Sequence, residues 1–206
     1  MNTLIMAGKI LVSTAYLPPV EYFSLISRAD EVLIEREENY VKQSFRNRCY
    51  ILSAHGPQLL SIPVYLGSLH KTQLRDIRID YSKRWQQVHI GAITASYSAS
   101  PYFQFYFEYI EEVISKKPAF LIDLNTDLTE TILNMLKMKI QLRFTSKFET
   151  PAESLYDFRY RISPKNKSGF LVKEYLQVFN NANGFVHGLS IIDLVFNMGP
   201  EAVDFL

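Results

Sequence analysis

The first 35 residues change from strand spacing to helical spacing and back. Residues 9–14 are apolar and largely β-branched, which favours a strand. Pro18 and Pro19 force an extended bend, and residues 20–29 then take up helical spacing. Residues 31–35 predict the next strand. Because parallel strands are usually joined by a crossover helix, this opening predicts a β-α-β unit with parallel strands.

The next segment predicts shorter strands. Between residues 47 and 64, two apolar stretches flank Ala54, His55, Gly56 and Pro57, where glycine and proline supply turn geometry. We therefore expect a β-hairpin there. Residues 74–80 alternate between apolar and polar positions, which favours a further strand.

Helical periodicity dominates the middle of the chain. One face of a helix over residues 85–97 collects apolar and small side chains at three- and four-residue intervals: Trp85, Val88, His89, Ala92, Ile93, Ser96 and Tyr97. A second helix is expected from Pro101, with an aromatic stripe over residues 102–109. A third is expected over residues 127–139, where Asp127 and Glu130 have the spacing of a capping box.

The last third of the chain is less regular. Residues 141–148 and 175–179 favour strands, whereas residues 150–170 lose all periodicity and are expected to form a long surface loop. Ser190, with Asp193 three residues later, predicts the start of a short helix, and Gly199 with Pro200 predicts its end.

These elements predict an α/β fold, with a mixed α+β arrangement as the alternative. The expected core is a largely parallel or mixed sheet with flanking helices, plus a hairpin. The 206 residues suit one domain spanning residues 1–206, and 48% of them are hydrophobic, which is enough for a sizeable core.

Charge and cysteine usage narrow the setting. The 22 lysines and arginines nearly cancel the 21 aspartates and glutamates, so no global field draws the protein to nucleic acid or to an anionic membrane. The single cysteine, Cys49, cannot form an intrachain disulfide, and neither a signal peptide nor a transmembrane segment is evident. We therefore expect a cytoplasmic protein without nucleic-acid or membrane partners.

An ordered series of short motifs resembles the WbqC-like family along nearly the whole chain. It includes Tyr16, Pro18 and Pro19; Tyr22 and Phe23; Glu38, Asn39 and Tyr40; Ser44, Phe45, Arg46, Asn47 and Arg48; Trp85 with His89; Pro101 with Tyr102 and Phe103; Asn125; and Leu189 to Gly199. The resemblance implies a bacterial protein with a role in surface polysaccharide, the O-antigen, or its amino-sugar precursors. In one respect the chain departs from the family pattern. Ser13 and Thr14 stand where many members have glutamine and proline.

The strongest local signal is a cationic segment, residues 40–48. If it is extended, its alternate residues project from one face: Tyr40, Lys42, Ser44, Arg46 and Arg48. Arginine forks and hydroxyl groups bind phosphate or carboxylate well. The alternative is a solvated edge strand, or cations paired with the upstream acidic residues Glu31, Glu35, Glu37 and Glu38, which would leave no site.

His89 lies four residues after Trp85 on an apolar helical face. A partly buried imidazole in that setting suits a general base. The competing interpretation is a core histidine whose hydrogen bonds are satisfied. No histidine pair has metal-binding spacing, and no glycine-rich nucleotide motif or nucleophile elbow occurs, so we expect neither a metal nor a cofactor.

The leading hypothesis is an enzyme of group transfer acting on an anionic small molecule, in the form of acyl or aminoacyl transfer to an amino sugar. Its catalytic residues would be His89, Asn47 and Tyr16, with His89 as the base. Its substrate-binding residues would be Tyr40, Lys42, Ser44, Arg46, Arg48 and Trp85. The alternative is a non-catalytic binding or assembly module that uses the cationic segment and the aromatic helices.

Overall fold

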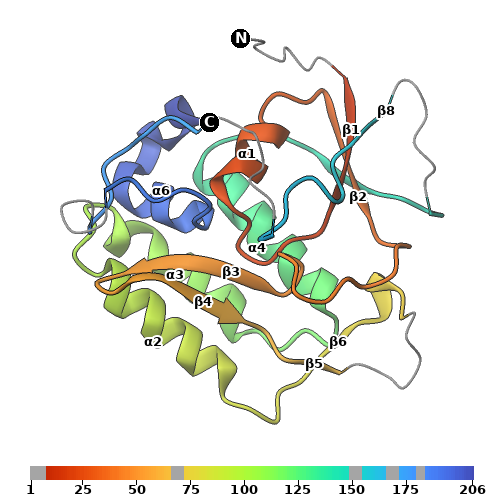
Figure 1. Ribbon diagram of the computed structural model, residues 1–206, viewed down its shortest axis with the longest axis horizontal. Coiled ribbons are helices and arrows are strands. Elements are labelled where there is room, and N and C mark those ends of the chain that lie inside the picture. Colours follow the sequence, from red (N-terminus) through yellow and green to blue (C-terminus); the bar gives the residue numbers. More distant parts are fainter. Residues whose placement is uncertain (1–7, 66–71, 149–154, 166–171, 180–183) are drawn as a thin grey trace.

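A four-stranded parallel sheet forms one side of the molecule (Figure 1). The structure, a computed structural model, describes residues 8–65, 72–148, 155–165, 172–179 and 184–206. The strand order is β7-β2-β1-β8, with β1 at Lys9–Ser13, β2 at Glu31–Glu35, β7 at Leu142–Phe144 and β8 at Leu155–Asp157. All three pairings are parallel. The predicted α/β class is confirmed.

The opening β-α-β unit is also confirmed. Helix α1, Val20–Ile26, joins β1 to β2, and Lys9 pairs with Glu31 to set their register. The helix is shorter than predicted. All of its residues are buried, because it lies between the sheet and the C-terminal helix, which it contacts (Figure 1).

The predicted hairpin is present as β3, Arg48–Ser53, and β4, Gly56–Ser61, which pair antiparallel. Gly56 has a φ of 100°, a value that glycine tolerates and other residues rarely adopt. The hairpin lies apart from the parallel sheet and contacts helix α2, Trp85–Tyr97 (Figure 1).

The strand predicted over residues 74–80 is wrong for most of its length. A 3₁₀ turn, η1, covers Leu74–Asp76, and only β6, Arg78–Ile79, is a strand, paired with β5, Val64–Tyr65. Leu74 and Ile77 are both fully buried. Alternation would place residues three apart on opposite faces, whereas one 3₁₀ turn places both in the core.

The three central helices match their predicted positions in part. Helix α2 has the predicted bounds, and α3 covers Phe103–Ser115. Helix α4, Leu121–Met135, begins one and a half turns before the predicted capping box. Its buried stripe starts at Leu121 and continues through Leu124 and Leu128, so Asp127 lies exposed in mid-helix.

The predicted loop over residues 150–170 contains β8, so its description as structureless is wrong in the part that the structure describes. Residues 175–179 form no strand either. The side chain of Gln177 instead bonds to the backbone of Val186. Its Oε1 accepts a hydrogen bond from the N–H of Val186, and its Nε2 donates one to the Val186 carbonyl.

Helix α6, Ile191–Met198, begins where predicted, and the 3₁₀ helix η2, Gly199–Phe205, follows it. Ser190 caps α6, since its hydroxyl accepts a hydrogen bond from the backbone N–H of Ile192. Ser190→Ala should therefore lower the free energy of unfolding by about 1 kcal/mol in denaturant titrations. Ser98→Ala, at an exposed position, serves as the control. If the free energies of unfolding of Ser190→Ala and Ser98→Ala are equal, the Ser190 hydroxyl does not stabilise the helix as a cap.

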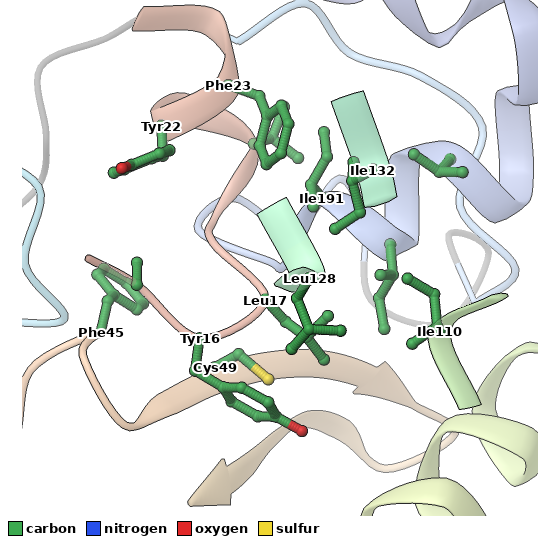
Figure 2. Close-up of a cluster of buried hydrophobic side chains, with 14 of the residues drawn as sticks. Tyr16, Leu17, Tyr22, Phe23, Phe45, Cys49, Ile110, Leu128, Ile132 and Ile191 are labelled. Carbon is green, nitrogen blue, oxygen red and sulfur yellow. The ribbon is translucent and has the colours of Figure 1, made fainter. Parts of the chain in front are cut away.

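The hydrophobic core joins the N-terminal segment to the hairpin and the helices (Figure 2). Figure 2 shows Tyr16 and Leu17 reaching toward β3, with α4 beside them. Tyr16 and Leu17 are fully buried, and the backbone at Tyr16 donates to the carbonyl of Phe45. This contact fixes the segment after β1 against the cationic segment.

Candidate functional site

Polar side chains gather where the parallel strands end. Ser13 and Glu35 are the last residues of β1 and β2, Thr145 follows β7, and Asp157 ends β8. Because parallel strands present their carboxyl ends at one edge, all four side chains reach that edge of the sheet. Glu35 is fully buried.

Arg46 is the first of two buried arginines at this edge. Its Nε donates to Glu38 Oε1 at 3.0 Å and its Nη2 donates to Glu38 Oε2 at 2.7 Å. Nη2 also donates to Ser13 Oγ at 2.6 Å, and the Ser13 hydroxyl donates to Glu38 at 2.6 Å. Arg46 and Glu38 are 4% and 1% exposed, so the ion pair is almost completely buried.

Arg159 is the second buried arginine, two residues beyond β8. Its Nη1 donates to Glu35 Oε2 at 3.0 Å, and its Nε and Nη2 donate hydrogen bonds to the two carboxylate oxygens of Asp157. Thr145 donates to the other oxygen of Glu35 at 2.6 Å. Burial alone would raise the pKa of Asp157, but the hydrogen bonds from Arg159 outweigh it and hold that pKa below its usual value.

The charged side chains around this edge form a network of ion pairs. The acidic members are Glu35, Glu37, Glu38, Asp76 and Asp157, and the basic ones are Arg36, Arg46, Arg75 and Arg159. Glu37 pairs with the more exposed Arg75 and Arg36, and the exposed Asp76 also lies near Arg75. Losing one buried member of such a network carries a large penalty, because its partner is left buried without a counter-charge.

Two half-exposed aromatic rings cover the arginines. The ring of Tyr160 lies 5.8 Å from the guanidinium carbons of both Arg46 and Arg159. Phe148 lies 4.6 Å from that of Arg159. Tyr160 and Phe148 are 52% and 51% exposed, so each ring lies between solvent and one side of the guanidinium groups.

A small cleft opens between the ends of β1 and β8. Its lining includes Thr14, Arg46 and Arg159. From β1 the chain continues to β2, which is the neighbour of β1 on one side. Strand β8, the neighbour of β1 on the other side, comes much later in the chain. The cleft between β1 and β8 therefore lies at the point where the strand order reverses. Open parallel sheets bind their ligands at such points.

Two polar groups in the cleft lining remain available to a ligand. Among the described residues, neither Arg46 Nη1 nor the Thr14 hydroxyl has a hydrogen-bond partner, and neither atom is sealed from solvent. Glu38 and Ser13 hold the other side of the Arg46 guanidinium group. The cleft can therefore offer a fixed cationic edge and a hydroxyl group to an anion.

Tyr16, Asn47, Trp85 and His89 form a second buried group, which we call the histidine group. The hydroxyl of Tyr16 lies 2.8 Å from His89 Nδ1, and the rings of Trp85 and His89 are 5.1 Å apart. Asn47 donates to the carbonyl of Ile62 at 2.8 Å, next to Ser61, whose backbone bonds to His89. The structure thus brings these four predicted residues together, but Arg46 joins Ser13 and Glu38 instead.

His89 has the surroundings of a hydrogen-bonded core histidine. It is 3% exposed, and burial lowers its pKa to about 4 against a weaker opposing bond to the Ser61 backbone. Burial, aided by the charge of Cys49, raises the pKa of Tyr16 well above its usual value. Both groups are therefore neutral at pH 7. The catalytic role of His89 stays a prediction, and it requires the ring to become accessible.

The prediction that the cationic segment, residues 40–48, is an extended strand is wrong. Residues 42–47 form turns and bends, in which Gln43 has a φ of 56° and the Ser44 hydroxyl donates to the Val41 carbonyl. Lys42 is exposed, Tyr40 is half-buried with a pKa that burial raises to about 12, and Arg48 begins β3. The five side chains therefore share no strand face, and the predicted alternative, acid pairing, holds for Arg46.

Sequence reasoning missed Arg159 and the functional position of Ser13 and Thr14. Their only signal was position, since each lies at or just beyond the carboxyl end of a strand, and β8 itself was not predicted. Asn125, which matched a family motif, donates to the Arg46 carbonyl at 2.8 Å and so fixes the backbone of the arginine.

Several buried polar atoms in the histidine group and near it have no partner among the described residues: Asn47 Oδ1, Trp85 Nε1 and Asn125 Oδ1. Cys49 is buried, and burial raises the pKa of its thiol.

Within the described ranges, no helix has both the length and the apolar character needed to cross a membrane. The same residues contain no group of three or more acidic, histidine or cysteine side chains placed to hold a metal ion.

Comparison with known proteins gives two findings. The WbqC-like protein family matches residues 14–168, which include Thr14, Arg46 and Arg159. The chain is also similar to the uncharacterized protein Rv1507c of Mycobacterium tuberculosis (strain ATCC 25618 / H37Rv), with 26% identity over 95% of this chain and 96% of that protein. No solved structure matches it. The chain therefore belongs to the WbqC-like protein family.

Proposed function

We propose that this protein is an enzyme of group transfer that holds an anionic small molecule in the cleft between β1 and β8. The observation that carries the proposal is Arg46, which lines the cleft at the strand-order reversal and whose Nε and Nη2, but not Nη1, are bound by Glu38 and Ser13. A guanidinium group fixed on one side keeps its other donors aimed without further ordering cost.

In the proposed reaction the donor is an activated acyl or aminoacyl compound and the acceptor is an amino sugar of bacterial surface polysaccharide. The acceptor nitrogen bonds to the acyl carbon, the bond from that carbon to the leaving group breaks, and a base takes the ammonium proton. Arg46, Arg159 and Thr14 would bind the anionic group. Of the residues predicted from the sequence, His89 is the base to be tested.

A thermal-shift screen tests the binding step. Candidate ligands are phosphate, short carboxylates, amino acids, acyl thioesters and sugar nucleotides. A ligand present at about 100 times its dissociation constant stabilises the fold by about 2.7 kcal/mol. We expect an anion to stabilise the wild type and the exposed-cation control Lys42→Ala equally, and to lose its effect in Thr14→Val. Equal shifts in all three proteins would place binding outside the cleft.

The second candidate, a non-catalytic binding module, has one observation in its favour. Phe105 and Tyr109, one turn apart on α3, are 68% and 56% exposed, and Val88 on α2 is 63% exposed. Exposed aromatic residues at this spacing are typical of a partner surface. If no small molecule binds and Phe105→Ser abolishes self-association in light scattering, this candidate replaces the enzyme.

A further inference from the structure

Residues 175–177 are fastened to α6 by one buried carboxylate. Asp193 is fully buried in the first turn of α6. Its Oδ2 accepts from the Tyr175 hydroxyl at 2.7 Å and from Gln177 Nε2 at 3.1 Å. Gln177 also bonds to the N–H and the carbonyl of Val186. The Asp193 carboxylate therefore joins two irregular stretches of the chain to the helix.

A second buried carboxylate, Glu21 on α1, contacts the same part of the chain. It is 6% exposed, and it accepts hydrogen bonds from its own backbone N–H and from that of Gly188. Its charge also raises the pKa of the Tyr175 hydroxyl. One oxygen of each carboxylate, Glu21 Oε2 and Asp193 Oδ1, is buried without a hydrogen-bond partner among the described residues. Ionisation is costly for a carboxylate in this state.

The side chains that face Asp193 carry no charge at pH 7. They are Tyr97 at the end of α2, Tyr175 and Gln177, and their hydrogen bonds favour the ionised carboxylate. Burial outweighs these bonds and raises the pKa of Asp193 to about 6. Helix α6 packs against α1, α3, β3 and η2, and none of the described charged side chains on these elements shifts the pKa of Asp193.

Neither carboxylate forms an ion pair with a described residue. The exposed His187 is the titratable group that faces Glu21. Lys173 and Arg28 donate instead to backbone carbonyls within residues 204–206. Because no buried counter-charge offsets the loss of hydration, ionisation weakens the folded arrangement around each carboxylate.

We infer that Asp193 and Glu21 form a pH-sensitive clasp, which holds residues 175–177 and 185–188 against α6 and α1 when the carboxyls are protonated and releases them on ionisation. The contribution of Asp193 is complete below about pH 3.9 and is lost as the pH rises through 6, because its pKa is raised in the folded protein. The clasp is independent of the proposed anion site.

Native-state hydrogen exchange tests the clasp, because the N–H of Val186 donates to Gln177 and reports on its closure. After correction for the intrinsic effect of pH on exchange, the protection factor of Val186 should fall about tenfold between pH 5 and pH 7 from Asp193 alone. Asp193→Asn should remove most of this change, and adding Glu21→Gln should remove the rest. Asp30→Asn, at an exposed position, is the control and should keep it.

The urea dependence of exchange distinguishes release of the clasp from global unfolding. Exchange at Val186 should respond little to low concentrations of urea, whereas exchange at Leu128, fully buried in α4, should accelerate strongly. Equal protection and equal urea dependence at the two amides would overturn the inference, and this comparison needs the wild type alone. An undiminished pH effect in folded Asp193→Asn would also overturn it.

Discussion

Arg46→Ala is expected to lower the free energy of unfolding by about 3–5 kcal/mol, because it leaves the Glu38 carboxylate buried without a counter-charge. Glu38 is 1% exposed and receives three short hydrogen bonds, two from Arg46 and one from Ser13. Removing the arginine deletes two of them at once. Urea titration at pH 7 measures the loss.

A double variant separates the stability role of Arg46 from its binding role. Glu38→Leu combined with Arg46→Met replaces the buried ion pair by apolar side chains of similar volume, a change that often costs little stability. We expect the double variant to recover most of the stability lost in Arg46→Ala and to bind no anion in the cleft. Retained anion binding by a folded double variant would contradict the assignment of Arg46.

The second large effect is a pair of opposite pH dependences. Burial lowers the pKa of His89 to about 4, so the stability that neutral His89 contributes is complete above about pH 6.5 and is lost as the pH falls through 4. Burial raises the pKa of Asp193 to about 6, against opposing hydrogen bonds from Tyr175, Tyr97 and Gln177. Its contribution is complete below about pH 3.9 and is lost as the pH rises through 6.

Two variants isolate these titrations. Between pH 7 and pH 4, the stability advantage of the wild type over His89→Gln should shrink by about 3 kcal/mol. The advantage over Asp193→Asn should change in the other direction, shrinking by about 2 kcal/mol as the pH rises from 4 to 7. Denaturant titrations at several pH values measure both. A pH-independent difference for His89→Gln would show that its imidazole is solvated in the folded protein.

Local sequence patterns sufficed for the helices and the hairpin. The faces of α2 and α3 and the turn at Gly56 depend on residues within a few positions of one another, so spacing alone reveals them. Helix α4 was found but placed six residues late. The capping-box spacing at Asp127 predicted a later start, but the helix begins at Leu121 because its buried apolar stripe begins there.

The candidate site was less accessible to sequence reasoning because its contacts are distant in the chain. Arg159 meets Glu35 across 124 positions, and its carbonyl accepts from Ser13 across 146. Strand β8, which brings Arg159 to the sheet, has three residues and shows no periodicity of its own. By contrast, Arg46 and Glu38 are eight positions apart, and their pairing was one of the alternatives considered.

Crystallography of the protein soaked with sodium bromide tests the central claim most directly, since anomalous scattering locates the bromide ion independently of the protein. The account predicts one ordered bromide ion between β1 and β8, within hydrogen-bond distance of Arg46 Nη1 and the Thr14 hydroxyl. Bromide bound only outside this cleft, with the cleft empty, would contradict it.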